Sequence, residues 1–371
     1  MLATRFTPSP QPHAPFNKHC ELATRHPTLY DVKGDVVLVA RQTDSLRQLF
    51  RVHSNQFGQW ASLLQAANVR GTVYYLTPEG IEDGPCVEMG DAADDVAAFL
   101  STHKLGATEL LDTWGITKHD PALPSKIGAI LRISHRYQLD SQNMRTLFCS
   151  AWPQSLAEWD AADRKFRSIA TNMVETNGAI PGRYAEDNFP EAASAIRLAQ
   201  DVDLPEIIPA AFYHLSRIPV SHDWDARRRP TSHRSSRYLA PASRSAKWNL
   251  LTSAGFRRIL HGREKILEFM VDNWAKSVFV ACHASCSNPS RECLMHYHAL
   301  TSLHNMLSED EEAYNDPLRL LQRRFSHPIA TIQERFNICK TCAESAWRIS
   351  MAKRAELWDL LPDFFDVFPE Q

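Results

Sequence analysis

Hydrophobic and polar positions follow two different patterns along this sequence, and the change falls roughly at the end of its first third. The early part carries short runs rich in β-branched residues, which predict strands. These predicted strands are Asp35–Ala40, Leu49–His53, Thr72–Leu76 and Pro85–Met89. The polar segment Arg41–Gln48 separates the first two runs, so they predict a hairpin with a loop longer than the tight two-residue kind.

Apolar residues in the remaining chain recur with the period of about 3.6 that indicates helices. Within the strand-rich part, helices are predicted at Trp60–Ala67 and Asp94–Leu100. Further amphipathic patterns follow at Ile127–Tyr137, Glu191–Leu198, Leu204–Arg217, Phe256–Lys276, Leu294–Leu307, Leu318–Phe325 and Ile338–Leu360. A helix should also begin at Ser155, because Ser155 and Glu158 have the spacing of a capping box. The predicted fold class is α+β: a small sheet flanked by helices, followed by a mainly α-helical C-terminal region.

Composition places the chain among ordinary globular proteins. Hydrophobic residues make up 44% and charged residues 23% of its 371 residues, so most of it can bury enough apolar surface to fold. This length exceeds what one core usually serves, so we expect several compact parts. We predict a proline-rich disordered leader at 1–25, a strand-rich domain at 26–150, a helical extension at 151–220, a basic flexible loop at 221–250 and a helical C-terminal region with a cysteine cluster at 251–371.

The balance of charge excludes some classes of partner. The formal net charge is −2, so no field of the whole molecule attracts nucleic acid or an anionic membrane. No apolar run approaches the roughly 20 residues that cross a bilayer. The segment Met1–Lys18 carries prolines where a secretory signal has an apolar core. We therefore expect a cytoplasmic or nuclear protein without a membrane or nucleic-acid partner.

Several of these segments, taken in order, resemble the BTB/POZ domain. The matching pieces are Gly34–Leu38, Phe50–His53, Val87–Asp91 with the helix after it, and Ile130–Leu139. Later pieces resemble the BTB proteins that are numerous in mushroom-forming fungi, and these are Leu204–Tyr213, His261–Leu267, Cys339–Cys342 and Leu357–Phe365. The resemblance implies a protein-interaction module or adaptor that is not an enzyme and that self-associates.

The resemblance also implies a candidate interaction surface. In dimerising members, an aspartate of the first strand and a basic residue after the strand-end histidine form a charged pocket at the dimer interface. This sequence has Asp35 and His53 at the matching positions, and Ser54 where the basic residue is expected. Asp35, His53 and Ser54 are therefore the residues that we expect to contact a protein partner or a second copy of the chain.

Four cysteines near the C-terminus form the sharpest chemical signal. Cys339 and Cys342 have the two-residue gap that lets both sulfurs reach one tetrahedral ion, and Cys286 and Cys293 form a second pair. Together they predict a structural zinc site. Rival ligands lie nearby, namely Cys282, His283, His296 and His298. The alternative is that the thiols are free and buried, because free cysteine behaves as a small hydrophobe.

A basic segment leaves a second hypothesis open. Residues 226–263 contain no acidic residue, and their basic members include Arg227, Arg228, Arg229, Arg234, Arg237, Arg244 and Lys247. The segment is either a solvated flexible insertion or a phosphate-binding patch, and the patch would make the chain a zinc-stabilised nucleic-acid-associated protein.

Two more readings concern what the chain does. The resemblance implies a substrate adaptor for a cullin-type ubiquitin ligase as a third hypothesis, and a lineage-specific copy with little activity as a fourth. The sequence has no phosphate-cradling glycine loop, nucleophile elbow or paired-histidine metalloprotease motif, so it favours no enzymatic activity.

Overall fold

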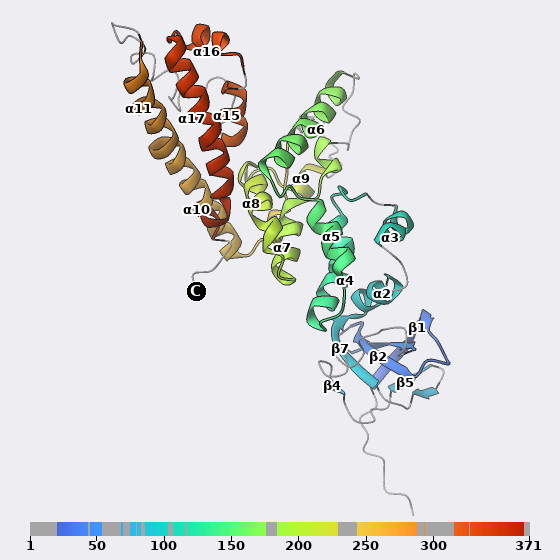
Figure 1. Ribbon diagram of the computed structural model, residues 1–371. Coiled ribbons are helices and arrows are strands. Elements are labelled where there is room, and N and C mark those ends of the chain that lie inside the picture. Colours follow the sequence, from blue (N-terminus) through green and yellow to red (C-terminus); the bar gives the residue numbers. More distant parts are fainter. Residues whose placement is uncertain are drawn as a thin grey trace, which may run out of the picture. The chain divides into compact units, whose positions relative to one another are not determined.

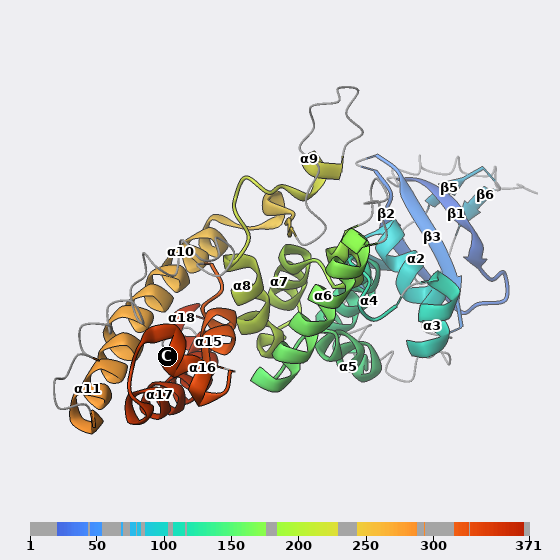
Figure 2. The same cartoon turned by 90° about the horizontal axis from the view of Figure 1, so that it is seen from above.

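The architecture is mixed α/β, with a small sheet near the N-terminus followed by helices (Figures 1 and 2). The computed structural model describes residues 21–43, 45–53, 68–69, 75–78, 80–82, 86–102, 107–115, 117–175, 184–228, 243–287, 293, 315–325 and 327–366. Contacts divide the chain into one unit of residues 1–106 and 129–141 and a second of residues 107–128 and 142–371. The division falls inside helix α4, Leu123–Arg136, whereas the sequence predicts a boundary at 150.

The first unit contains a mixed sheet whose described strands have the order β4-β7-β2-β3-β1-β5-β6. The strands are β1 Glu21–Tyr30, β2 Val36–Arg41, β3 Arg47–Val52, β4 Asn68–Val69, β5 Tyr75–Thr77, β6 Gly80–Glu82 and β7 Cys86–Ala92. β2 and β3 form the predicted antiparallel hairpin, with Leu38 opposite Phe50, and β2 also pairs in parallel with β7. β2 is buried on both faces, which explains its unbroken apolar run.

β1 lies where the sequence predicts the end of a disordered leader. The strand begins at Glu21 and pairs in parallel with β3 and β5, so ordered structure starts earlier than predicted. Pro27 has no N–H for the ladder, and the register of β1 against β3 is irregular around it. The side chain of His26 satisfies a neighbouring backbone group, because its Nδ1 accepts from the N–H of Leu29 at 3.1 Å, and its ring stacks on Phe50 at 5.1 Å.

Helix α2, Ala93–Thr102, and the later half of α4 complete the described part of the first unit. Asp91, at the end of β7, is buried and accepts from Nη1 of Arg136 at 2.6 Å and from Oη of Tyr137 at 3.0 Å. The backbone N–H of Gly90 donates to the same Tyr137 oxygen at 3.3 Å. These bonds fasten α4 and the turn after it to the end of β7.

The second unit is helical over most of its described residues. Its elements after α4 and before the long C-terminal helices are α5 Gln142–Ser150, α6 Leu156–Glu175, η2 Ala185–Asn188, α7 Ala192–Asp201, η3 Pro205–Ile207, α8 Ile208–Ser216, α9 Trp224–Arg228 and η4 Trp248–Leu250; α3 Ala107–Trp114 precedes α4. The remaining elements are α10 Ser253–Glu268, η5 Phe269–Ala275, α11 Lys276–Ser285, α15 Pro317–Phe325, α16 Ile329–Phe336, α17 Lys340–Asp359 and α18 Leu361–Phe364.

Most predicted helices are present with shifted ends. The exceptions are Trp60–Ala67 and Leu294–Leu307, which lie outside the described residues. Ser155 caps α6 as expected, since its Oγ accepts from the N–H of Glu158 at 3.3 Å, while the Glu158 carboxylate accepts from the N–H of Gln154 at 2.7 Å.

Among the described helices, none combines the length and the apolar run needed to cross a bilayer.

One long helix runs from α10 through the π-helical segment η5 into α11, and α17 packs beside it (Figure 1). Trp274 in η5 is almost fully buried, and its Nε1 donates to Oγ of Ser350 in α17 at 2.9 Å. At the other end, the ring of Phe365 stacks on Phe212 of α8 at 5.5 Å and lies directly against Gly262 of α10. The chain after α17 therefore closes onto α8 and α10.

Because of this contact, we predict that Gly262→Ala lowers the free energy of unfolding by about 1–3 kcal/mol, the usual cost of overpacking. An ideal Cβ at residue 262 would lie 2.1 Å from Cε1 of Phe365, whereas at Gly255 of the same helix the nearest atom would be 3.5 Å away. Gly255→Ala is the matched control, and it should be neutral or stabilising by up to about 1 kcal/mol. Urea denaturation measures both, and equal effects would contradict the close fit at Gly262.

Candidate functional site

The four cysteines suggested as metal ligands lie together in the second unit. The Sγ atoms of Cys286, Cys293, Cys339 and Cys342 are all within 4.8 Å of one another. Four thiolates about 2.3 Å from one tetrahedral zinc lie about 3.8 Å apart, so the cluster needs only a small contraction to hold the ion. None of these four cysteines forms a disulfide bond. The arrangement can therefore bind one tetrahedral metal ion.

Helix ends hold these thiols in place. Cys286 follows the last residue of α11, Cys339 is the N-cap of α17, and Cys342 lies in the first turn of α17. Burial raises the pKa of the Cys342 thiol well above its ordinary value. The backbone N–H of Cys339 donates to Sγ of Cys293 at 3.2 Å. Burial raises the pKa of Cys339, but hydrogen bonds, first among them one from Ser287, outweigh it and lower this pKa to about 5. Cys339 is thus a thiolate at neutral pH.

The rival ligands that the structure describes lie outside this cluster. The thiol of Cys282 donates to the carbonyl oxygen of Cys342 at 3.7 Å, and burial raises the pKa of Cys282 to about 11. His283 is exposed on α11. His296 and His298 lie outside the described residues. Of the ligands considered from the sequence, the structure brings together the four cysteines.

The candidate interaction surface is described in part. Asp35 is exposed at the start of β2, and Ser54 lies outside the described residues. His53 pairs with a different acid from the one singled out in the sequence, because its Nε2 lies 3.1 Å from Oδ2 of Asp31. Asp31 precedes the hairpin and matches no motif, so only the fold shows that it meets His53.

The C-terminal end of the predicted basic loop is packed into the second unit. Ser245 donates to the buried carboxylate of Glu186 through both its hydroxyl and its backbone N–H, at 2.6 Å each. Arg244 reaches a buried carboxylate of α6, as described below. The prediction of a flexible loop at 221–250 is therefore wrong for 243–250, because its polar groups find buried partners, and for Trp224–Arg228, which form α9. Residues 229–242 lie outside the described residues.

A buried cluster of charges joins α6, α8 and the turn before α15. Arg217, just after α8, donates to the carboxylate of Asp316, and its Nη1 lies 3.8 Å from Oδ1 of Asp163. Oη of Tyr213 donates to Asp316 at 2.8 Å, and Nη2 of Arg244 donates to Asp163 at 3.2 Å. Two guanidinium groups therefore face two carboxylates, which keeps the cluster close to neutral, as a buried site requires.

The cluster sets the protonation of its neighbours. Burial raises the pKa of Asp316, but Arg217 and Arg244 outweigh it and lower this pKa below its ordinary value. Burial, helped by Arg217, lowers the pKa of His214 well below its ordinary value. Nη2 of Arg217 donates to Nδ1 of His214 at 3.1 Å, so the neutral ring carries its proton on Nε2.

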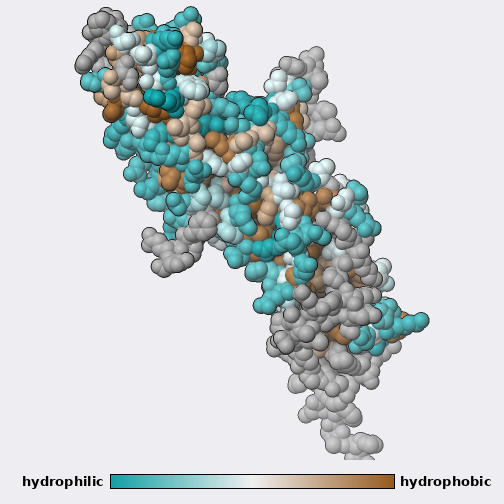
Figure 3. All heavy atoms as spheres, in the orientation of Figure 1, coloured by the Kyte–Doolittle hydropathy of each residue, from teal (hydrophilic) through white to brown (hydrophobic). Residues whose placement is uncertain are grey.

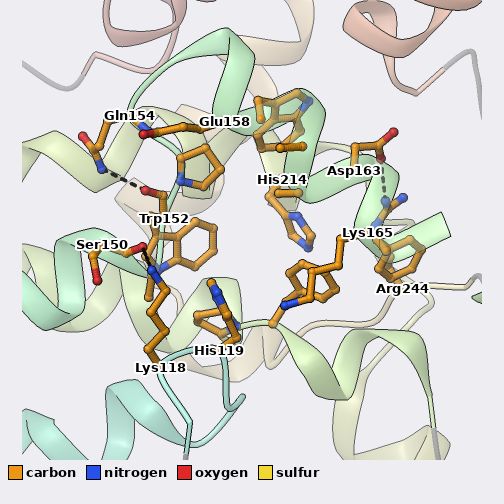
Figure 4. Close-up of a pocket in the computed structure, with 18 of the residues that line it drawn as sticks. Lys118, His119, Ser150, Trp152, Gln154, Glu158, Asp163, Lys165, His214 and Arg244 are labelled. Carbon is orange, nitrogen blue, oxygen red and sulfur yellow. Dashed lines mark hydrogen bonds and ion pairs between the residues drawn. The ribbon is translucent and has the colours of Figure 1, made fainter. Parts of the chain in front are cut away.

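A cavity of about 460 Å³ lies beside this cluster within the second unit (Figure 4). Its walls come from α6, from the turns before α4 and α6, and from the segments around η2, α8 and Arg244. The volume is in the range of small-molecule sites. No sequence pattern predicts this cavity, because its lining residues lie far apart in sequence. The only local signal is that Trp152 and Trp159 flank the predicted helix start at Ser155.

Comparison with known proteins identifies no relative of the chain. No family model, no curated protein and no solved structure matches it. The cysteine cluster, the charge cluster and the cavity are therefore interpreted from their own geometry.

We predict that Asp316→Asn lowers the free energy of unfolding by about 3–5 kcal/mol, because it leaves Arg217 buried with one carboxylate fewer. Asp112→Asn in α3 is the matched control, since Asp112 is exposed and should cost less than about 0.5 kcal/mol. Chemical denaturation near neutral pH measures both variants. A similar loss in the two would show that the buried pair adds nothing to stability.

The same carboxylate predicts sensitivity to acid. The pKa of Asp316 is lower in the folded than in the unfolded chain, so its contribution is present above the unfolded value of about 3.9 and is lost as the pH falls through the folded value. Below about pH 4, the wild type should therefore lose stability more steeply with falling pH than Asp316→Asn does. Denaturation midpoints measured across this range test the difference, and parallel pH profiles would contradict it.

Proposed function

We propose that the chain is a non-enzymatic protein-interaction module with a BTB/POZ-like sheet unit and a zinc-stabilised helical unit. The sheet unit would associate with a protein partner or with a second copy of the chain. The helical unit would be held in shape by one zinc ion on Cys286, Cys293, Cys339 and Cys342.

One observation carries the proposal for the sheet unit: the segments that resemble the BTB/POZ domain contact one another. Strands β7, β2 and β3 are adjacent in the sheet. Asp91, from the segment at the end of β7, binds Arg136 and Tyr137 from the later helical segment. Short motifs that match by chance have no reason to meet in this way, so their contact supports one common fold.

The zinc proposal rests on the fit between the thiols and the ion. Four sulfurs converge, one of them is a thiolate at neutral pH, and a backbone N–H already donates to another. Such N–H···S bonds orient metal-binding cysteines in known sites. The ion would fasten the chain around Cys286 and Cys293 to the start of α17, so metal binding would contribute directly to folding.

Exposed apolar side chains support a protein partner over nucleic acid. Leu260, Leu267 and Val271 are exposed by 40% or more along the outer side of α10 and η5, and Figure 3 shows brown patches on the helical unit. Arg244 and Arg263, from the basic segment, instead donate to groups within the protein. These two arginines are therefore engaged within the protein, which weakens the hypothesis that the basic segment binds the phosphates of a nucleic acid.

For the interaction surface, we predict that the full chain self-associates in sedimentation equilibrium and that Asp35→Ala with His53→Ala weakens this association at least tenfold. Charged groups at an interface contribute to specificity and are costly to remove from one partner. Asp225→Ala, at an exposed position in α9, is the control and should leave the association unchanged. A chain that stays strictly monomeric and retains no partner in a pulldown would refute the proposal.

For the metal, we expect the purified chain to carry one zinc ion, measured by plasma mass spectrometry, and Cys339→Ser with Cys342→Ser to lose it. The double variant should unfold at a lower temperature, because metal-binding energy is folding energy. Cys149→Ser in α5 is the control and should keep both the zinc and the melting temperature, since Cys149 is a free thiol outside the cluster. Wild-type protein that contains no zinc and is stable without it would refute the metal site and leave four packed cysteines, two of them buried.

A further inference from the structure

The cavity beside Arg217 has polar groups that the protein itself does not satisfy. Among the described residues, Nε1 of Trp152 and Nδ1 of His119 are buried and have no hydrogen-bond partner. Trp152 is only 5% exposed, and both side chains line the cavity. An indole N–H is a donor only, so Trp152 requires an acceptor from outside the protein. Unpaired buried groups of this kind are uncommon in folded proteins, and an acceptor held in the cavity would pair this one.

The charges around the cavity favour an anion. Lys118 and Lys165 are exposed residues of its lining. Lys118 donates to the carbonyl oxygen of Ser150 at 3.1 Å, and Nζ of Lys165 lies 5.8 Å from the ring centre of Phe189. In the part of the chain that the structure describes, neither lysine has a carboxylate partner.

The carboxylates of the lining are already engaged. Asp163 is bound by Arg244 and Arg167, and Glu158 accepts the N–H that caps α6. The bond from a neutral N–H leaves the charge of Glu158 in place, so the two lysines give the lining an excess of positive charge that suits an anionic ligand.

The rest of the wall suits a flat apolar body. The rings of Trp152 and Trp159 both make edge contacts with His214, at centroid distances of 6.2 and 6.4 Å, and Phe166 and Phe189 add two further faces. Figure 4 shows Trp152, His119, Lys165 and His214 around the central space. Aromatic rings in a ligand pack well against such walls, edge to face or offset.

Both histidines of the cavity are neutral near pH 7. Burial, followed by the charges of Lys165 and Lys118, lowers the pKa of His119 to about 4. His214 is neutral for the reasons given above. Neither ring therefore competes with the lysines as a counter-ion, and both can form neutral hydrogen bonds.

We propose that this cavity binds a small aromatic carboxylic acid. The ring would lie among the aromatic walls, the carboxylate would face Lys118 and Lys165, and the indole N–H of Trp152 would donate to the ligand. This site is separate from the cysteine cluster and from the interaction surface of the sheet unit, and it adds ligand binding to the proposed function.

The test uses 2-naphthoate as the probe and the full chain, with binding measured by isothermal titration calorimetry. We expect saturable binding at one site per chain. The neutral isostere 2-naphthamide should bind at least tenfold more weakly, because it cannot pair with the lysines. If 2-naphthoate does not bind, or binds no better than the amide, the proposal is overturned.

Variants locate the site. Lys118→Met with Lys165→Met removes both charges but keeps apolar stems, and it should weaken 2-naphthoate binding at least tenfold while leaving the amide unaffected. Trp152→Phe keeps an aromatic wall but removes the N–H, and it should weaken binding about tenfold, the usual effect of one hydrogen bond to a charged group.

Lys276→Met is the control, because Lys276 is exposed on α11 and does not line the cavity. The two cavity lysines are themselves exposed, so their variant should fold even if Trp152→Phe does not. Unchanged 2-naphthoate affinity in the double lysine variant would place the binding elsewhere and refute the assignment.

Discussion

A guanidinium buried at the end of α8 is the constraint on which the helical unit depends. Arg217 lies over the ring of Trp159 at 4.5 Å and donates to Asp316, a residue 99 positions later in the chain. A buried charge without a partner would cost far more than a single domain can supply. The helices α6 and α8 and the turn that carries Asp316 must therefore come together at the same time, and their packing is cooperative for that reason.

The cavity follows from the same constraint. Asp163 on α6 is held by arginines from two other segments, which fixes the rotation of α6 about its axis. That rotation turns Trp159 and Phe166 toward the cavity. Arginines bind the carboxylate of Asp163, and among the described residues Lys118 and Lys165 line the same cavity without an ion-pair partner. The arginines neutralise Asp163 inside the unit, and the positive charges of Lys118 and Lys165 remain at the exposed rim of the cavity.

Sequence patterns correctly predicted the features that depend on residues close together in the chain. The run Val37–Ala40 in β2 is apolar because both faces of the strand are buried, and the start of α6 is fixed by the bonds of Ser155 and Glu158 to nearby N–H groups. The pair Cys339 and Cys342 could be recognised because its spacing is set within one helical turn. The paired partners Asp31 and His53, the cavity and the Arg217 cluster join residues far apart in sequence, so no period or motif could show them.

β1 is an element that local sequence patterns failed to predict. Its first residues, 21–25, belong to the predicted disordered leader, yet β3 gives the backbone of β1 a partner. Propensity was overridden by pairing with a strand that lies later in the chain. A tertiary contact of this kind decides strand formation more often than local preference does.

α17 joins the cysteine cluster of the helical unit to α6, the helix that lines the cavity. Cys339 and Cys342 lie at its start, and near its end Nη1 of Arg354 donates to Oδ2 of Asp160 on α6 at 3.0 Å. Arg354 also donates to the carbonyl oxygen of Leu318 at 2.7 Å, which ties α15 to the same point. A metal ion that stabilises the first turn of α17 would therefore stabilise the position of α6 as well. The coupling requires no second conformation, because one continuous helix carries both sets of contacts.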